Sequence, residues 1–304
     1  MKIRVLSDLH IDVNEMYAYH RVTHLKDNDV YTIVAGDTAG CPELAADWIQ
    51  KNVQKGLVIA GNHIVYSSNY RPIQDLKKQM AQTFPKDAPI TFLDHMTGTM
   101  AKEVDNILFI GTTLYTNYTL LPNVSAKDAM YYANSRHGLN DFYCGYTRDH
   151  GKVRPINPKD YQRWFIESYK EMTRLIQSHP DKDVVVITHH CPSRRCCRDG
   201  YDLLHTSYAS DLEPFILKHP NIKLWVCGHV HERKNFKVGN CLVLMNPQGY
   251  AHEGESFNFN PHTFVDTRDW SVHQESNLNN LGKQMEIQDK ALFQNMLKRA
   301  CFEL

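Results

Sequence analysis

Near its start the chain reads IRVLSDLH over residues 3–10, and this stretch decides the fold. Its first half is rich in β-branched and aliphatic side chains, which is typical of a buried strand. Its second half carries Asp8 and His10, which are two residues apart and therefore project to the same side of an extended backbone. The stretch predicts a strand that presents a carboxylate and an imidazole together at its carboxyl end.

Apolar runs of this kind alternate along the chain with helical patterns, which favours an α/β architecture. We expect strands at residues 3–6, 30–35, 57–60, 107–110, 184–188, 224–227 and 242–245, and helices at residues 42–53, 73–84, 158–178 and 207–219. Asp105 and Asn106 predict a hairpin turn between strands at residues 99–104 and 107–111.

Polar donors directly follow five of these apolar runs. The donors are Asp8 and His10, Asp37, Asn62 and His63, His189 and His190, and His229 and His231. Open α/β sheets form their sites at the carboxyl ends of strands, so we expect the five ends to converge in one crevice. Glycines at positions 36, 61 and 228 let the chain turn sharply and approach an ion closely. Each motif alone is more often an ordinary turn, but five in succession at strand ends need five separate coincidences.

The candidate donors comprise two carboxylates, one amide oxygen and four imidazoles, with His63 and His190 left outside this ligand count. This set is too large for one tetrahedral zinc ion and suits two divalent cations that share a bridging carboxylate. Manganese, iron, zinc, cobalt and nickel all remain open as the two ions, and manganese is favoured. Ligation needs neutral imidazoles, so binding is expected to weaken as the pH falls toward the pKa of free imidazole.

The composition excludes several classes of protein. The 304 residues include 34 Lys plus Arg and 34 Asp plus Glu, and this balance argues against a protein that wraps nucleic acid by bulk electrostatics. No apolar run approaches the roughly 20 residues that span a bilayer, and residues 1–8 lack the pattern of a signal peptide. We therefore expect a cytoplasmic protein that does not enter a membrane.

The eight cysteines are expected to be reduced thiols. None belongs to a C-x-x-C pair, and the group Cys191, Cys196 and Cys197 lacks the spacing of a zinc ribbon. A structural zinc site built from cysteines is therefore not favoured.

Two regions differ from the rest of the chain. Residues 115–163 interrupt the alternation and hold seven of the 16 tyrosines, which indicates an aromatic-rich inserted cap. No strand is expected after residue 266, and residues 279–300 predict a terminal helix with a broken apolar stripe. We expect a main domain at residues 1–266 and a helical extension at residues 267–304.

In their order and spacing the strand-end motifs resemble those of the calcineurin-like metallophosphoesterases, over about residues 3–250. The resemblance implies a four-layer α/β/β/α sandwich of two β-sheets flanked by helices. It implies that Asp8, His10 and His231 hold one metal ion, that Asn62, His189 and His229 hold a second, and that Asp37 bridges them. His189 is preferred to His190 because the family ligand directly follows the strand.

The chain departs from the family pattern at two positions. An acidic residue often follows the Gly-Asn-His motif, but Ile64 stands there, and Gly40 stands where the family often has Asp or Arg. Neither position is a metal ligand, but the residue after the Gly-Asn-His motif, here Ile64, is one that would help to orient His63.

The resemblance implies hydrolysis of phosphate esters by in-line attack of a metal-bridging hydroxide. His63 is the candidate general acid or charge stabiliser, and the alternative is a residue that only hydrogen-bonds Asp37 or Asp8. A small phosphodiester or nucleotide is the favoured substrate. A metal-dependent nuclease, a phosphomonoesterase or protein phosphatase, and a non-catalytic scaffold of the same fold remain as alternatives; the oligomeric state stays open.

Several further side chains are candidates for contact with substrate. A guanidinium fork matches phosphate geometry, so Arg194, Arg195 and Arg198 are candidates for a second phosphate, with a solvated loop as the alternative. Asn140 and Asp141 are candidates to face the metals from the cap, or else form a plain turn. Cap aromatics would stack on a base, or else form a small core; they are Tyr115, Tyr118, Phe142 and Tyr143.

Overall fold

Two six-stranded β-sheets form the centre of the molecule in the computed structural model, which describes residues 1–16, 25–200 and 202–274. In spatial order, the first sheet contains β14 (Ser271–Gln274), β13 (Thr263–Asp266), β1 (Lys2–Leu6), β2 (Val30–Ala35), β3 (Gly56–Ile59) and β4 (Ile90–Phe92). The second sheet contains β11 (Lys234–Val238), β12 (Cys241–Met245), β10 (Ile222–Cys227), β9 (Asp183–Thr188), β6 (Ile107–Thr112) and β5 (Ala101–Val104).

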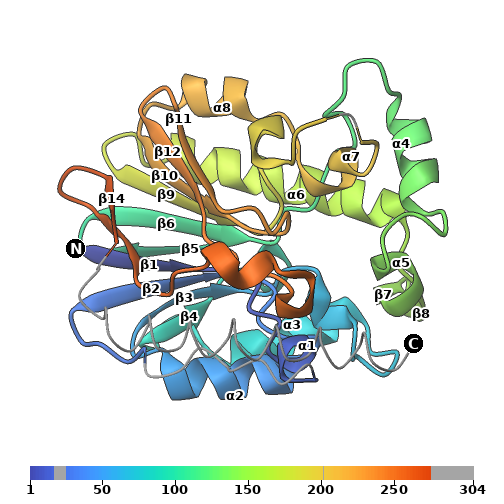
Figure 1. The fold of residues 1–304 in the computed structure, drawn as a ribbon, viewed down its shortest axis with the longest axis horizontal. Coiled ribbons are helices and arrows are strands. Elements are labelled where there is room, and N and C mark those ends of the chain that lie inside the picture. Colours follow the sequence, from blue (N-terminus) through green and yellow to red (C-terminus); the bar gives the residue numbers. More distant parts are fainter. Residues whose placement is uncertain (17–24, 201, 275–304) are drawn as a thin grey trace, which may run out of the picture.

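Helices cover the outer face of each sheet, which makes four layers (Figure 1). The first sheet is covered by α2 (Pro42–Asn52) and α3 (Ile73–Thr83), with the short α1 (Ile11–Met16) beside them. The second sheet is covered by α6 (Pro158–Gln177) and α8 (Glu213–Lys218). The expected α/β/β/α sandwich is confirmed.

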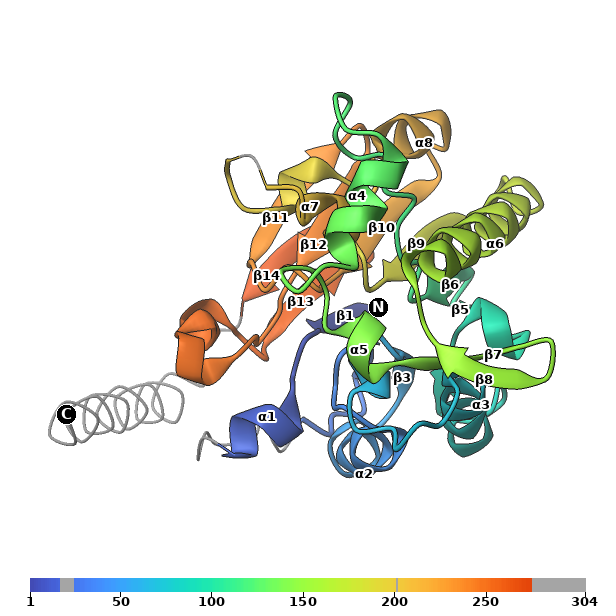
Figure 2. The same cartoon turned by 90° about the vertical axis from the view of Figure 1, so that its right-hand side faces the viewer.

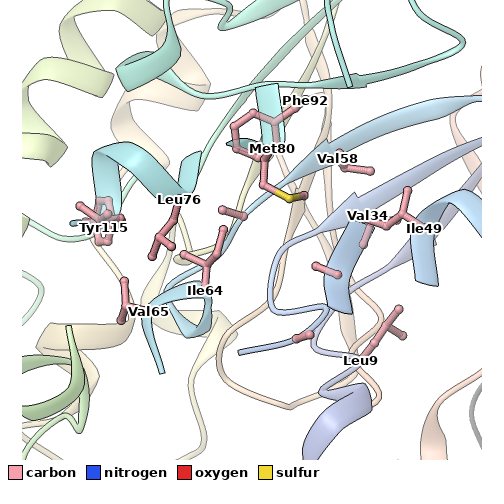
Figure 3. Packing of buried hydrophobic residues seen from close by; sticks show 14 of the residues in the cluster. Leu9, Val34, Ile49, Val58, Ile64, Val65, Leu76, Met80, Phe92 and Tyr115 are labelled. Carbon is pink, nitrogen blue, oxygen red and sulfur yellow. The ribbon is translucent and has the colours of Figure 1, made fainter. Parts of the chain in front are cut away.

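The alternation of side chains along the buried strands produces these layers. In β9, Val185 and Ile187 pack between the two sheets, whereas Val184 and Val186 pack beneath the outer helices. The central strands, such as β2, β6 and β9, are thus buried on both faces, which explains why they read as nearly continuous apolar runs. Figure 3 shows part of the corresponding packing on the first sheet, where Met80 of α3 and Phe92 of β4 lie close together.

Most sequence predictions of elements agree with the structure. All seven predicted apolar strands form, and three of the predicted helices begin at the expected residue. Asp105 and Asn106 both have positive φ (49° and 63°), which is the backbone of a type I′ hairpin between β5 and β6.

Two predictions of elements were wrong. The helix expected at residues 207–219 is two short helices, α7 (His205–Tyr208) and α8, because the N–H groups of Ser210 and Leu212 donate to carbonyls of the loop after β9 instead of to a helix. Strands do not stop at residue 266, because β13 turns back into β14 and extends the sheet edge. The helix predicted at residues 279–300 lies outside the described residues.

The predicted cap at residues 115–163 lies beyond the carboxyl ends of the strands (Figures 1 and 2). It contains α4 (Ala126–Ala133), α5 (Asp141–Cys144) and the hairpin β7 (Tyr146–Asp149) and β8 (Lys152–Pro155). Short 3-10 helices complete the connections; they are η1 (His63–Val65), η2 (His95–Thr97), η3 (Arg194–Cys196), η4 (Ala251–Glu253) and η5 (Glu255–Asn258). Among the described residues, no helix combines the length and the apolar character that crossing a membrane requires.

A buried ion pair fastens α3 to the first sheet. Lys77 Nζ lies 2.8 Å from Asp94 Oδ2, and neither side chain is exposed. Burial lowers the pKa of Lys77, against the opposing effect of Asp94. Burial on its own would raise the pKa of Asp94, but Lys77 and His95 hold it below its usual value. Lys77 also donates to Thr113, just after β6, so the pair ties together the layers that support the strand ends.

We predict that Lys77→Met destabilises the protein by about 3–5 kcal/mol, because it leaves the Asp94 carboxylate buried without a counter-charge. Lys78→Met, which changes an exposed neighbour on the same helix, should alter stability by less than about 0.5 kcal/mol. Urea unfolding of the two variants measures the difference. Equal stabilities for Lys77→Met and Lys78→Met would show that the pair is not structurally important.

Candidate metal centre

Five strand-end loops meet at one edge of the sandwich, three from the first sheet and two from the second. Within the first sheet, the Asp8 N–H donates to the Gly36 carbonyl at 3.1 Å, and the Asp37 N–H donates to the Ala60 carbonyl at 3.1 Å. The His229 N–H donates across the sheets to Asp8 Oδ1 at 2.8 Å. Backbone hydrogen bonds therefore hold the loops together before any side chain binds a ligand.

Many candidate ligands have an unusual backbone conformation. Positive φ values occur at Asp8 (51°), His10 (41°), Asp37 (50°), His229 (69°) and His231 (56°). The left-handed region is uncommon for residues other than glycine, and such strained residues cluster at functional sites. The reversals after β1, β2 and β10 turn these side chains toward the shared edge.

Two glycines leave room for the carboxylates. A Cβ at Gly61 would collide with the Asp37 carboxylate and backbone, and one at Gly228 would collide with the Asp8 carboxylate. Gly61 also has a φ of +76°, a conformation that side chains disfavour. These two glycines therefore let the backbone lie close to the candidate carboxylate ligands.

The first group of candidate ligands is Asp8, His10 and His231, whose ligand atoms all lie within 4.8 Å of one another. The Nε2 atoms of His10 and His231 are 3.0 Å apart. Two ligands at right angles on an ion with bonds of about 2.1 Å would stand about 3.0 Å apart. The Nδ1 atom of His231 faces Glu255 Oε2 at 2.6 Å, an arrangement that leaves Nε2 turned toward the group.

The second group is Asp37, His189 and His229, again within 4.8 Å. His189 Nδ1 lies 2.9 Å from the Ala35 carbonyl, which only accepts, so Nδ1 carries the proton. His189 Nε2 is then directed at Asp37 Oδ2, 3.0 Å away. These contacts orient the imidazole as a ligand would be oriented.

Asn62 adjoins the second group and is held by the cap. Its Nδ2 donates to Asp141 Oδ1 at 2.8 Å, which leaves its Oδ1 as the free donor atom for an ion. Asp141 also accepts from Tyr66 OH at 3.0 Å and from Tyr161 OH at 2.5 Å. The structure therefore places Asp141 behind Asn62, with both carboxylate oxygens engaged by protein donors.

The donor atoms fit divalent cations. Five buried atoms of the candidate ligands have no hydrogen-bond partner within the described part of the chain; they are Asp8 Oδ2, His10 Nδ1, Asn62 Oδ1, His189 Nε2 and His229 Nε2. Buried polar atoms are almost always paired, and an unpaired one costs about 1–3 kcal/mol. Bound cations would satisfy the two unpaired oxygen atoms and the Nε2 atoms of His189 and His229.

His63 lies against both groups, and three residues orient it. Its ring stacks on Tyr66 with 3.8 Å between centroids, and its ring Nε2 is 2.9 Å from Tyr250 OH. Its backbone N–H donates to Asp37 Oδ1. Ile64, which stands where the family often has an acidic residue, is 1% exposed and packs in the core near Leu76 (Figure 3). Aromatic neighbours thus orient His63 without that acidic residue.

His190 is buried and is not a member of either ligand group. Its ring stacks on that of His229, with 4.2 Å between centroids and 28° between planes. Its place is therefore behind a candidate ligand.

The candidate substrate residues lie at different distances from the metal centre. Arg194 and Arg195 donate to the carbonyls of Gly200 and Lys237, within the surface loop and β11. Arg198 alone reaches the edge of the centre, where it contacts Glu255 at 3.1 Å. Asn140 is exposed at the start of α5.

Of the four candidate cap aromatics, three are buried and one is exposed. Tyr115, Tyr118 and Phe142 belong to the buried core cluster, so the alternative of a small core describes them. Tyr143 is 59% exposed.

Sequence reasoning missed Tyr250 and Glu255 as orienting residues. Tyr250 ends the Asn246–Tyr250 stretch that follows β12, so its position after a strand was an available signal. Glu255 follows no strand, and nothing in its local sequence indicates that it contacts His231.

Neighbouring charges shift the pKa values of the imidazoles in opposite directions. Burial alone would lower the pKa of His189 and His231, but Asp37 raises that of His189 to about 9, and Asp8 and Glu255 raise that of His231 to about 10. Burial and the surrounding imidazoles lower the pKa of His10 and His229. Without cations, the centre therefore holds two protonated and two neutral imidazoles at neutral pH.

Residues 1–233 match the family model of the calcineurin-like phosphoesterases. The chain belongs to the calcineurin-like phosphoesterase family. It is accordingly a metal-dependent phosphoric ester hydrolase of a family of dinuclear metal enzymes.

One solved structure with this fold is similar to the chain over most of its length. Phosphopantetheinyl hydrolase from Mycobacterium tuberculosis is similar at 15% identity with a TM-score of 0.63, covering 90% of this chain and 95% of that chain. An archaeal phosphodiesterase is more distant, at 14% identity and a TM-score of 0.35, covering 90% of this chain and 98% of that chain. No curated protein matches the sequence.

We predict that Asp141→Ala lowers the affinity for one of the two ions by about 10–100-fold, because Asn62 loses the carboxylate that orients it. Asp128→Ala, which removes an exposed carboxylate from α4 of the same cap, is the matched control. Metal content after dialysis against graded chelator concentrations measures both variants. Two ions held as tightly in Asp141→Ala as in the control would contradict the prediction.

For this calcineurin-like phosphoesterase, we predict that metal binding at pH 7 releases about two protons, because His189 and His231 must become neutral to act as ligands. Their raised pKa values mean that metal affinity already falls as the pH drops below about 9–10, well above the pKa of free imidazole. Calorimetric titration with zinc in buffers of different ionisation enthalpy counts the protons. No release at pH 7 would contradict the assignment of these imidazoles.

Proposed function

We propose that this calcineurin-like phosphoesterase hydrolyses a small phosphate ester, with a phosphodiester or nucleotide-type substrate favoured. The observation that carries the proposal is the cluster of largely buried candidate ligands, in which His63 lies within 4.8 Å of ligand atoms of His10 and Asp37, one from each of the two ligand groups. In this proposal the first ion is held by Asp8, His10 and His231, the second by Asn62, His189 and His229, and Asp37 stands between them.

When bound, the two ions supply Lewis-acid charge and an acidified water for in-line attack on phosphorus. Asp37 is suited to bridge because its Oδ1 is fixed by the His63 N–H, and its Oδ2 faces His189. The mixture of carboxylate, amide and imidazole donors is compatible with manganese, which we propose as the favoured metal.

The proposed role of His63 is to hold a proton for the leaving oxygen. Its Nε2 is 2.9 Å from Tyr250 OH, and stacking on Tyr66 fixes the plane of the ring. Burial and the nearby Asp37 and Asp8 raise the pKa of Tyr250, so its hydroxyl stays protonated. Tyr250 is then a positioning residue that keeps the imidazole aimed at the centre.

The substrate end of the site is proposed to lie between the cap and the loop after β9. Arg198 is the candidate for a second phosphate, since its side chain is 60% exposed and contacts Glu255 at the edge of the centre. On the cap, Asn140 and Tyr143 are exposed, and Tyr143 would stack on a base. Zero net charge favours a small substrate over a polynucleotide.

We predict that the manganese-loaded protein hydrolyses bis(p-nitrophenyl) phosphate or p-nitrophenyl phosphate, and that Asp37→Ala abolishes turnover. His63→Asn should retain two ions and lower kcat by about 10²–10⁴-fold, since it removes proton donation to the leaving oxygen. The loss should be larger for a phenyl than for a p-nitrophenyl leaving group, because the poorer leaving group needs the proton more.

His137→Asn, an exposed histidine of the cap, is the matched control and should leave kcat unchanged. Equal losses for the two leaving groups would remove the general-acid role from His63. Failure of the wild-type protein to hydrolyse either nitrophenyl ester would count against the proposed substrate class.

A further inference from the structure

Three buried cysteines meet beneath the loops that carry the second group of candidate ligands. Cys191 lies just after β9, Cys196 ends η3, and Cys227 ends β10. Their Sγ atoms all lie within 4.8 Å of one another, and all three residues are fully buried. We call this group the thiol cluster.

The thiol cluster is assembled by the fold and differs from the group considered in the sequence. The sequence group contained Cys197, but the thiol cluster contains Cys227 in its place. Of the two consecutive cysteines at the end of η3, only Cys196 faces the other two thiols. The three cysteines come from segments whose spacing matches no zinc motif, so their meeting could not be read from the sequence.

The geometry points to a second kind of metal site: we propose that Cys191, Cys196 and Cys227 bind one thiophilic divalent cation of the zinc class, separate from the dinuclear centre. Soft thiolate ligands select such cations, whereas the dinuclear centre offers only oxygen and nitrogen. Thiolates on one tetrahedral ion with bonds of about 2.3 Å stand about 3.8 Å apart, which the observed separations allow.

A divalent ion also suits the charge of the pocket. Three thiolates and a divalent cation leave one negative charge, while a monovalent cation would leave two in surroundings that are mostly apolar. Lys234 lies nearby, with its ammonium bonded to the carbonyl of Cys197, next to Cys196. Binding exchanges the three thiol protons for the ion and involves no oxidation or reduction.

The fourth donor is available from the backbone. The Gly228 carbonyl oxygen lies 3.2 Å from Cys191 Sγ and accepts a hydrogen bond from this thiol. This oxygen also accepts the Val230 N–H, so it would offer an ion beside Cys191 its remaining lone pair and complete, with the three sulfur atoms, the four ligands that zinc prefers.

The bound ion would cross-link the loop after β9 to the end of β10. His189 precedes Cys191 by two residues and His229 follows Cys227 by two, so the cross-link would fasten the segments that carry both imidazoles. The site would therefore be structural, and it would hold in place the two segments that carry His189 and His229.

Cadmium titration of the full-length protein tests the proposal, because sulfur-to-cadmium charge-transfer absorption arises only from thiolate ligands. The wild-type protein should give a band that saturates at one ion per chain. Cys196→Ser should reduce the band at least tenfold, whereas Cys197→Ser, which changes the adjacent buried thiol outside the cluster, should keep it. Asp37→Ala should also keep it, since this variant alters only the dinuclear centre.

Retained binding of manganese by Cys196→Ser shows that this variant is folded, so a lost band then reports the thiol cluster itself. Absence of a saturable sulfur band in the wild-type protein would overturn the proposal. A band of equal strength in Cys196→Ser would also overturn it, because cadmium would then be bound by other thiols. Equal loss of the band in Cys196→Ser and Cys197→Ser would overturn it as well, because the band would then not depend specifically on the three proposed ligands.

Discussion

The structure depends on burying two carboxylates of like charge, those of Asp8 and Asp37, at one edge of the sandwich. Burial opposes the ionisation of both carboxylates, and the charge of Asp37 further opposes that of Asp8. Both nevertheless have lowered pKa values, that of Asp37 because of His189 and His63, and that of Asp8 because of protonated His231 and His189. Uncompensated buried charge is expensive, so the edge is stable only with protons on those imidazoles or with cations in their place.

The geometry of the loops follows from this constraint. Donors from four of the five strands approach the centre through a sharp reversal as the strand ends, which accounts for left-handed residues such as His10 and His229. It also accounts for Gly61, where a side chain would occupy the space that the Asp37 carboxylate needs. The strain in these turns is offset by the hydrogen bonds that the loops make with one another, including that from His229 to Asp8 across the sheets.

The α/β class and the strand positions could be predicted because their signals are local, while the four-layer arrangement was implied by the family resemblance. A buried strand of a parallel sheet is apolar on both faces, and a donor directly after it must lie at the carboxyl edge, so Asp37 could be placed from its neighbours in sequence. The residues that orient the ligands could not be placed in this way. Asp141 contacts Asn62 from an insert far along the chain, and Glu255 contacts His231 from a 3-10 helix with no periodic pattern. Such contacts depend on how elements pack, as does the break between α7 and α8, where loop carbonyls compete with helical hydrogen bonds.

The centre extends beyond the part of the chain that defines the family. The family match ends at residue 233, yet Tyr250 contacts His63 and Glu255 contacts His231. The backbone of this later segment is fastened to the first sheet's loops, since the Gly249 N–H donates to the Asp8 carbonyl. Asn14 strengthens the attachment by donating to the Gly249 carbonyl and accepting from the Ala251 N–H. The segment after β12 therefore positions the two residues that orient the candidate ligand and the candidate acid, which makes it part of the site rather than a connection to the end of the chain.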